Sequence, residues 1–175
     1  MIFAIDPGNE QSAWCVMSDQ YELLDFDKQP NAEVMKSMLY RLQVSNTAVP
    51  LYDSVVIERV AGYGMPVGRE VFETCEWIGR FSQEAEKLIP VNYIYRKDEK
   101  LTLCFDSKAK DANIRAALIE RFAKHDLKNG RGTKKDPDYF YGVKADIWAA
   151  IAVAVTYLDM KKEKTLSRAI GEIYK

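Results

Sequence analysis

An uninterrupted apolar segment near the C-terminal end of the chain most strongly limits the folds available to it. Nine consecutive residues, Ile147–Val155, have apolar side chains. They lie within a predicted helix, Ala145–Leu158, and a helix that is apolar on every side has to be buried. The run is shorter than the roughly 18 apolar residues that span a bilayer. The sequence therefore needs a sheet against which this helix can pack.

The first sixty residues predict strands for such a sheet. Three short segments, Ile2–Ile5, Ser12–Ser18 and Tyr21–Asp27, read as strands joined by tight turns, so we expect them to be antiparallel. The apolar spacing in Asn31–Val44 predicts an amphipathic helix. A strand at Leu51–Glu58 follows it, and a strand after a helical crossover is expected to run parallel to the first.

The rest of the chain predicts helices that flank the sheet. After a loop rich in glycine, the expected elements are a long helix Arg69–Leu88, a strand Val91–Tyr95, helices Lys97–Cys104 and Asp111–Lys124, a mobile loop Lys124–Gly142, the apolar helix, and a break at Lys161–Lys164 before a short last helix. Together these elements predict one α/β domain over residues 1–175. Its sheet is five-stranded and mixed, with the first three strands antiparallel.

Three carboxylates stand at the ends of predicted elements. Asp6 ends the first strand, Glu58 ends the fourth, and Asp146 begins the apolar helix. Taken singly, each has an ordinary structural role: Asp6 suits a turn, Glu58 can pair with Arg59, and Asp146 favours a helix N-terminus. If the first and fourth strands are parallel neighbours, however, all three meet at the sheet edge where ligands bind in open α/β folds.

A cluster of like charges favours a bound cation. Carboxylate oxygens suit Mg²⁺, with Mn²⁺ a plausible substitute, and two such ions can activate water at a phosphodiester. The single histidine, His125, leaves little material for mechanisms based on a histidine base. The three cysteines form no CxxC pair, so neither a zinc site nor a disulfide framework is expected.

The net charge of −1 conceals a separation of charge along the chain. Residues 96–135 contain 12 Lys or Arg and 6 Asp or Glu, whereas the remaining residues contain 13 and 20. A basic block within an acidic chain indicates a surface patch for a polyanion, although a solvated helical face has the same composition.

These motifs together resemble those of the RuvC family of Holliday-junction resolvases. The resemblance rests on Ile5-Asp6-Pro7-Gly8, on Val56-Ile57-Glu58 about fifty residues later, and on Ala145-Asp146 opening an alanine-rich helix. Gly79-Arg80 in the long helix and Tyr95-Arg96 before the basic block are also similar to family segments. The loop Tyr63–Gly68 and the element Val143–Trp148 look most like those of phage-type members.

The resemblance implies an RNase H-like fold and a homodimeric endonuclease that nicks four-way or branched DNA. Asp6, Glu58 and Asp146 would be the catalytic residues and hold Mg²⁺. Phosphates would be contacted by a basic set comprising Arg80, Arg96, Lys97, Lys100, Lys108 and Lys110. Tyr63 or Met65 would pack against bases near the crossover, and the helix Arg69–Leu88 would form the dimer face.

One position departs from the family pattern. The family commonly has a fourth acid one turn before the last aspartate, where this chain has Val143. Asp136 or Asp138 are candidate substitutes, and Asp111 is a weaker one. The departure leaves open whether one metal ion binds or two.

Two other functions remain open at this level. One is an RNase H-like nuclease acting on other nucleic acid, such as the YqgF-like RNA-processing group. The other is a junction-binding module without catalysis. The N-terminus resembles no signal peptide, and no membrane association is expected. We therefore expect a protein of the bacterial cytoplasm, either cellular or phage-encoded.

Overall fold

A five-stranded mixed sheet forms the centre of the computed structural model, which describes residues 1–44, 51–62, 64 and 66–173. The strand order is β3-β2-β1-β4-β5. The strands are β1 (Ile2–Asp6), β2 (Gln11–Met17), β3 (Leu23–Pro30), β4 (Ser54–Arg59) and β5 (Val91–Tyr95). β1, β2 and β3 are antiparallel, and β4 is parallel to both β1 and β5. The α/β fold expected from the sequence is thus confirmed.

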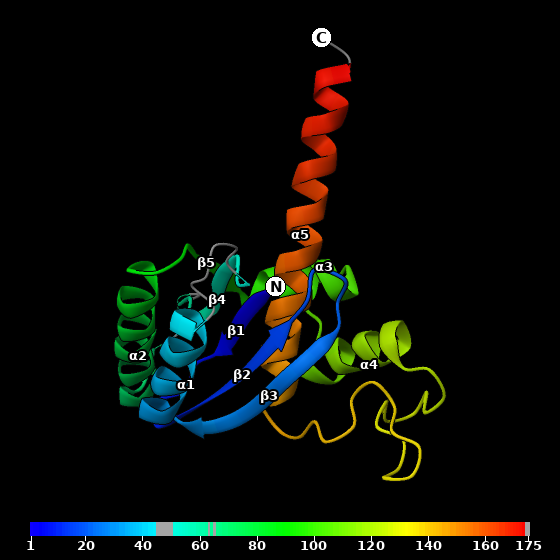
Figure 1. Ribbon diagram of the computed structural model, residues 1–175, viewed down its shortest axis with the longest axis horizontal. Coiled ribbons are helices and arrows are strands. Elements are labelled where there is room, and N and C mark those ends of the chain that lie inside the picture. The colour runs from blue at the N-terminus through cyan, green and yellow to red at the C-terminus, as the bar shows by residue number, and fades with distance from the viewer. Residues whose placement is uncertain (45–50, 63, 65, 174–175) are drawn as a thin grey trace.

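Helices cover both faces of the sheet (Figure 1). α1 (Asn31–Val44) and α2 (Arg69–Glu86) lie on one face, and α3 (Arg96–Cys104), α4 (Asp111–Phe122) and α5 (Ile147–Ile173) lie on the other. Alternation along β1 divides its side chains between the two layers. Phe3 and Ile5 pack under α1 and α2, whereas Ile2 and Ala4 pack under α5.

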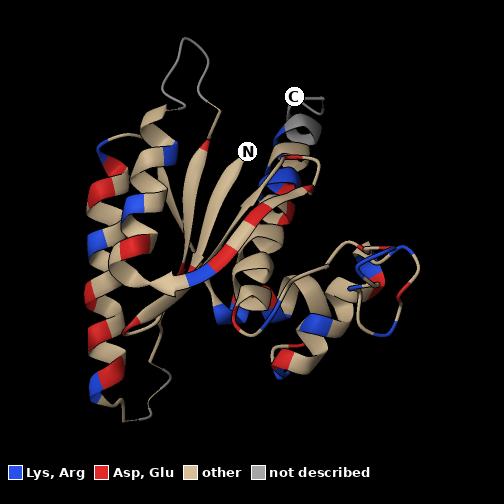
Figure 2. Cartoon of the chain, turned by 60° about the horizontal axis from the view of Figure 1, so that its bottom comes forward, with Lys and Arg blue, Asp and Glu red and all other residues tan. Residues whose placement is uncertain are grey.

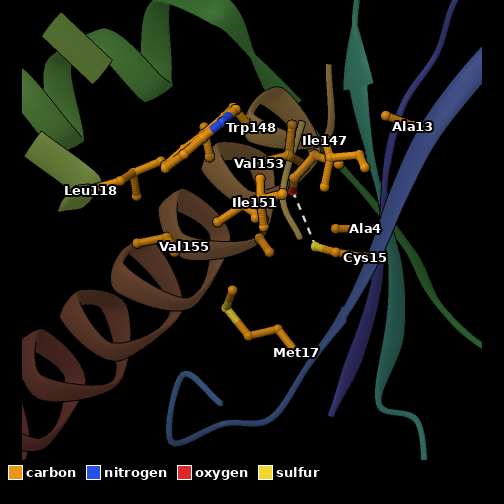
Figure 3. Packing of buried hydrophobic residues seen from close by; sticks show 14 of the residues in the cluster. Ala4, Ala13, Cys15, Met17, Leu118, Ile147, Trp148, Ile151, Val153 and Val155 are labelled. Carbon is orange, nitrogen blue, oxygen red and sulfur yellow. Dashed lines mark hydrogen bonds between the residues drawn. The ribbon is translucent and has the colours of Figure 1, made fainter. Parts of the chain in front are cut away.

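The apolar segment Ile147–Val155 forms the first third of α5, and it is buried as predicted except at Ala149, which is partly exposed. Small side chains on the sheet, Ala4, Ala13 and Cys15, let the helix lie close to β1 and β2 (Figure 3). The thiol of Cys15 donates to the carbonyl oxygen of Ala150 over 3.4 Å, and burial raises the pKa of Cys15. This close packing fixes the start of α5 against the sheet.

The predicted break at Lys161–Lys164 is wrong, because α5 continues without interruption to Ile173. Lysine and glutamate are good helix formers, and no proline or glycine stands there to end the helix. The second half of α5 extends beyond the sheet (Figure 1). None of the helices among the described residues is both long enough and apolar enough to cross a membrane.

The segment after α4 is a compact loop, although its composition predicts a mobile one. Two acidic side chains organise its backbone. The buried carboxylate of Asp138 accepts four backbone N–H groups, those of Lys124, His125, Asp126 and Tyr139. Asp126 accepts three more, those of Asn129, Arg131 and Gly132. Burial acts to raise the pKa of Asp138, but these bonds prevail and hold it below its usual value.

We predict that Asp138→Asn lowers the melting temperature by about 5 °C or more at neutral pH, because an amide accepts fewer N–H groups than a carboxylate. A depressed pKa stabilises the fold fully above the unfolded-state value of about 4, and the stabilisation is lost progressively as the pH falls toward the lower folded-state value. The difference between wild type and Asp138→Asn should therefore shrink as the pH falls below about 4. Thermal melts from pH 7 to pH 2 measure it. Asp136→Asn, at an exposed side chain in the same loop, is the control and should change little. An equal effect of both substitutions would contradict the assigned role.

Candidate active site

Asp6 and Glu58 are side by side because their strands are parallel and in register. Ile5 pairs with Ile57 across β1 and β4, and the two acids follow as the next residues. Ala4 and Val56, two residues earlier, face α5, so both carboxylates point to that same face. A shift of one residue in either strand would turn its acid to the opposite layer.

The proximity of these two carboxyl groups is electrostatically unfavourable. Burial, the negative charge of Glu58 and a hydrogen bond shared with Glu58 raise the pKa of Asp6 well above its usual value. Asp146 adds to this effect, and Arg96 opposes it. Such a pair is stabilised either by a shared proton or by a cation.

Asp146 completes the predicted trio from the start of α5. Its carbonyl oxygen accepts the N–H of Ala149, which begins the helix, and Ala145 before it has φ 41°, in the strained left-handed region. Its carboxylate contacts Lys28, which lies in the same row across the sheet as Asp6. The side chain is about half exposed, at 54%. The structure therefore brings all three predicted acids to one region.

Lys28 holds Asp146 in this arrangement, and the sequence analysis missed it. Its Nζ lies 2.5 Å from a carboxylate oxygen of Asp146. Ala13 pairs with Asp6 on one side and with Lys28 on the other, so a single row across the sheet carries both charges. The predicted strand ended at Asp27, whereas β3 continues to Pro30. Extending the alternation of β3 by one step would have placed Lys28 on the face of the acids.

Glu99, on α3, is the second residue that the sequence analysis missed. Its side chain is fully buried (0% exposed), and one oxygen accepts Nη1–H of Arg96 at 2.5 Å. Burial, followed by the negative charge of Glu58, raises the pKa of Glu99 well above its usual range. The signal available was its spacing of three residues from Arg96, which places both on one side of a helix.

Arg96 joins α3 to the start of α4. Its second guanidinium nitrogen contacts the carboxylate of Asp111 at 2.5 Å. Burial disfavours the charged guanidinium, but Glu99 and Asp111 more than compensate, and the pKa of Arg96 is raised. Arg96 also lines a groove that contains Asp146, so it connects the basic block to the acids.

Part of the predicted basic set gathers beside the acids. Arg96, Lys97 and Lys100 line one groove together with Ser107. Lys108 and Lys110, between α3 and α4, are exposed.

Arg80 lies elsewhere, on α2 across the sheet, where its guanidinium stacks on Trp77 with 4.7 Å to the ring centroid. Acidic and basic residues follow one another along this helix (Figure 2). Tyr63 and Met65 lie outside the described residues.

The candidates for a fourth acid occupy other positions. Asp138 is committed to the backbone of its loop, Asp136 lies beside His125, and Asp111 pairs with Arg96 at the surface. Val143 is fully buried in the apolar cluster under α5.

Comparison with known proteins identifies the fold. No family model and no curated protein matches the sequence. Among solved structures, RuvC of T. thermophilus in complex with a Holliday junction substrate aligns with a TM-score of 0.61 and 17% identity, over 93% of this chain and 94% of that one. The chain has the RuvC fold. A second structure of Thermus thermophilus RuvC aligns with a TM-score of 0.56 and 18% identity, over 94% and 96% of the two chains.

The side chains at this RuvC-like sheet edge suit a hard divalent cation in their chemistry. As they stand, no three His, Cys, Asp or Glu side chains within the described ranges are grouped closely enough to enclose a metal. Asp146 is engaged by Lys28. The paired carboxyls of Asp6 and Glu58 nevertheless offer the oxygen atoms that such a cation prefers, and so does a buried oxygen of Glu99 that has no partner among the described residues.

The burial of Val143 generates a prediction. Val143→Asp should lower the free energy of unfolding by at least about 3 kcal/mol, because it places an unpaired carboxylate in an apolar cluster. Val143→Ala, the control, should cost about 2 kcal/mol through lost packing alone. Urea denaturation with and without Mg²⁺ measures both values. A Val143→Asp protein as stable as wild type, or one stabilised more by Mg²⁺, would show that position 143 faces the metal site.

Proposed function

We propose that the protein is a metal-dependent endonuclease that nicks four-way (Holliday) or other branched DNA. The observation that carries the proposal is the adjacency of Asp6 and Glu58 at the edge of a RuvC-like sheet, with Asp146 close by. RuvC of T. thermophilus, which shares this fold, was solved with a Holliday junction substrate. The basic groove beside the acids supports a polyanionic substrate.

In this proposal, Asp6, Glu58 and Asp146 hold Mg²⁺ or Mn²⁺. The bound cation supplies activation of water and neutralisation of charge at the phosphodiester. A bound cation would favour the charged form of Asp6, and it would compete with Lys28 for the carboxylate of Asp146. Lys28 is then left beside the site, where its ammonium group can face a phosphate.

DNA contacts follow from the position of each basic residue. Lys97 and Lys100 line the groove next to the acids, with Lys108 and Lys110 exposed beyond it. We assign these lysines to phosphates, which give affinity without reading sequence. Arg80 would contact DNA only at a distance from the acids, because α2 covers the other face of the sheet. Tyr63 and Met65, which precede α2 in the sequence, remain proposed base contacts.

A homodimer suits a substrate with two opposed strands to nick. We propose that α2 forms its interface, because this helix lies at the outside of the molecule and exposes 61% of Phe72. A twofold axis would present two identical acidic sites to a junction of matching symmetry. Such an enzyme would serve recombination, repair or phage DNA processing in the bacterial cytoplasm.

A junction-binding module without catalysis is the second candidate. Two observations favour it: Lys28 engages Asp146, and Val143 stands where RuvC-family proteins commonly have an acid. The two functions differ in whether DNA is cut, so a cleavage assay separates them.

We expect Mg²⁺ to support symmetric nicking of a four-way junction by the wild-type protein. Matched linear duplex and RNA should be cut far more slowly. Asp6→Asn should abolish nicking while junction affinity in Ca²⁺ stays within about twofold, since the substitution removes a metal ligand and leaves the lysines in place. Gel assays of cleavage and binding measure both quantities. Glu10→Gln, at an exposed acid on the nearby turn between β1 and β2, is the control and should cleave normally.

Each contrary result has a distinct meaning. Wild-type protein that binds junctions but cuts nothing with Mg²⁺ or Mn²⁺ would favour the binding module. Cleavage of RNA without cleavage of junctions would favour the RNA-processing alternative.

A further inference from the structure

A buried carboxyl oxygen next to the acidic pair lacks the hydrogen bond that such an atom normally has. Glu99 is fully buried, and its Oε2 accepts from Arg96. Its Oε1 has no hydrogen-bond partner among the described residues. An unsatisfied buried polar atom of this kind costs free energy unless a ligand satisfies it.

The junction between β5 and α3 places Glu99 near the sheet edge. α3 begins directly after β5, whose Ile94 pairs with Glu58. The carboxylate of Asp98 accepts the N–H of Tyr95 at 2.9 Å and fixes the first turn of the helix. With this turn fixed, Glu99 lies on the inner side of α3.

The charges around Glu99 favour a ligand over a purely structural ion pair. The negative charges of both Glu58 and Asp6 act on it. On the side of α3, the positive charge of Arg96 offsets the negative charges of Glu99, Glu58 and Asp6. Arg96 also forms an ion pair with Asp111. For a purely structural pair, a neutral or apolar side chain at position 99 would be less costly.

We propose that Glu99 is a fourth carboxylate of the metal centre, joining Asp6, Glu58 and Asp146. Its free Oε1 is the ligand atom, and Arg96 holds Oε2 and positions the side chain. Glu99 thereby supplies from α3 the acid that Val143 cannot supply from the start of α5. The inference rests on the proposed metal-dependent function, and it assigns to Arg96 a positioning role.

Mn²⁺ binding to the whole protein, measured by calorimetry, tests this assignment without reference to cleavage. Glu99→Gln keeps the shape of the side chain but removes its charge, and it should weaken Mn²⁺ affinity at least about tenfold. Its metal-free melting temperature should equal or exceed that of wild type, because repulsion among the acids is relieved. Asp111→Asn is the matched control: it removes the other carboxylate on Arg96 and should leave Mn²⁺ affinity within about twofold.

The outcomes separate this inference from the proposed function. If Glu99→Gln binds Mn²⁺ with wild-type affinity, Glu99 is not a metal ligand. If its metal-free melting temperature is also lower than that of wild type, Glu99 has a structural role instead. If Asp6→Asn also bound Mn²⁺ like wild type, the metal centre itself would fail. If Glu99→Gln does not fold, Glu99→Asp replaces it: it retains a charge for Arg96 but withdraws the ligand oxygen, and the same loss of affinity is expected.

Discussion

Repulsion between two neighbouring carboxyl groups is the constraint on which the candidate site depends. Parallel pairing of β1 and β4 fixes Asp6 beside Glu58, and burial denies both groups full solvation. Folding therefore creates a local excess of negative charge that it does not neutralise. Arg96 and Lys28 offset part of this excess at its borders, through Glu99 and Asp146. A shared proton or a cation from solution has to compensate the rest.

The packing of α5 against the sheet brings a third acid, Asp146, to Asp6 and Glu58. Small residues on β1 and β2 admit the apolar helix close to the sheet, and its first turn delivers Asp146 to the edge where the strands end. α3 approaches the same edge from β5 and contributes Glu99. The acids thus come from four separate segments of the chain, and each segment is held by core packing or by strand pairing.

Local patterns predicted most of this architecture. Tight turns, alternating strands and one fully apolar helix indicated the mixed sheet, and the ends of its strands indicated Asp6 and Glu58. The two site residues that were not predicted depend on contacts across the sheet or between helices. Lys28 required the register of β3 with β2, and Glu99 required the packing of α3, which its short and highly charged sequence does not reveal. The length of α5 escaped because a charged segment was interpreted as a break, although its residues favour helix.

The central claim is that this sheet edge binds a divalent cation between Asp6 and Glu58. Diffraction from crystals soaked in Mn²⁺, measured at the manganese absorption edge, tests it most directly. We predict an anomalous peak between these two carboxylates, with Asp146 turned from Lys28 toward the ion. An empty edge at saturating Mn²⁺, with the contact between Lys28 and Asp146 intact, would contradict it.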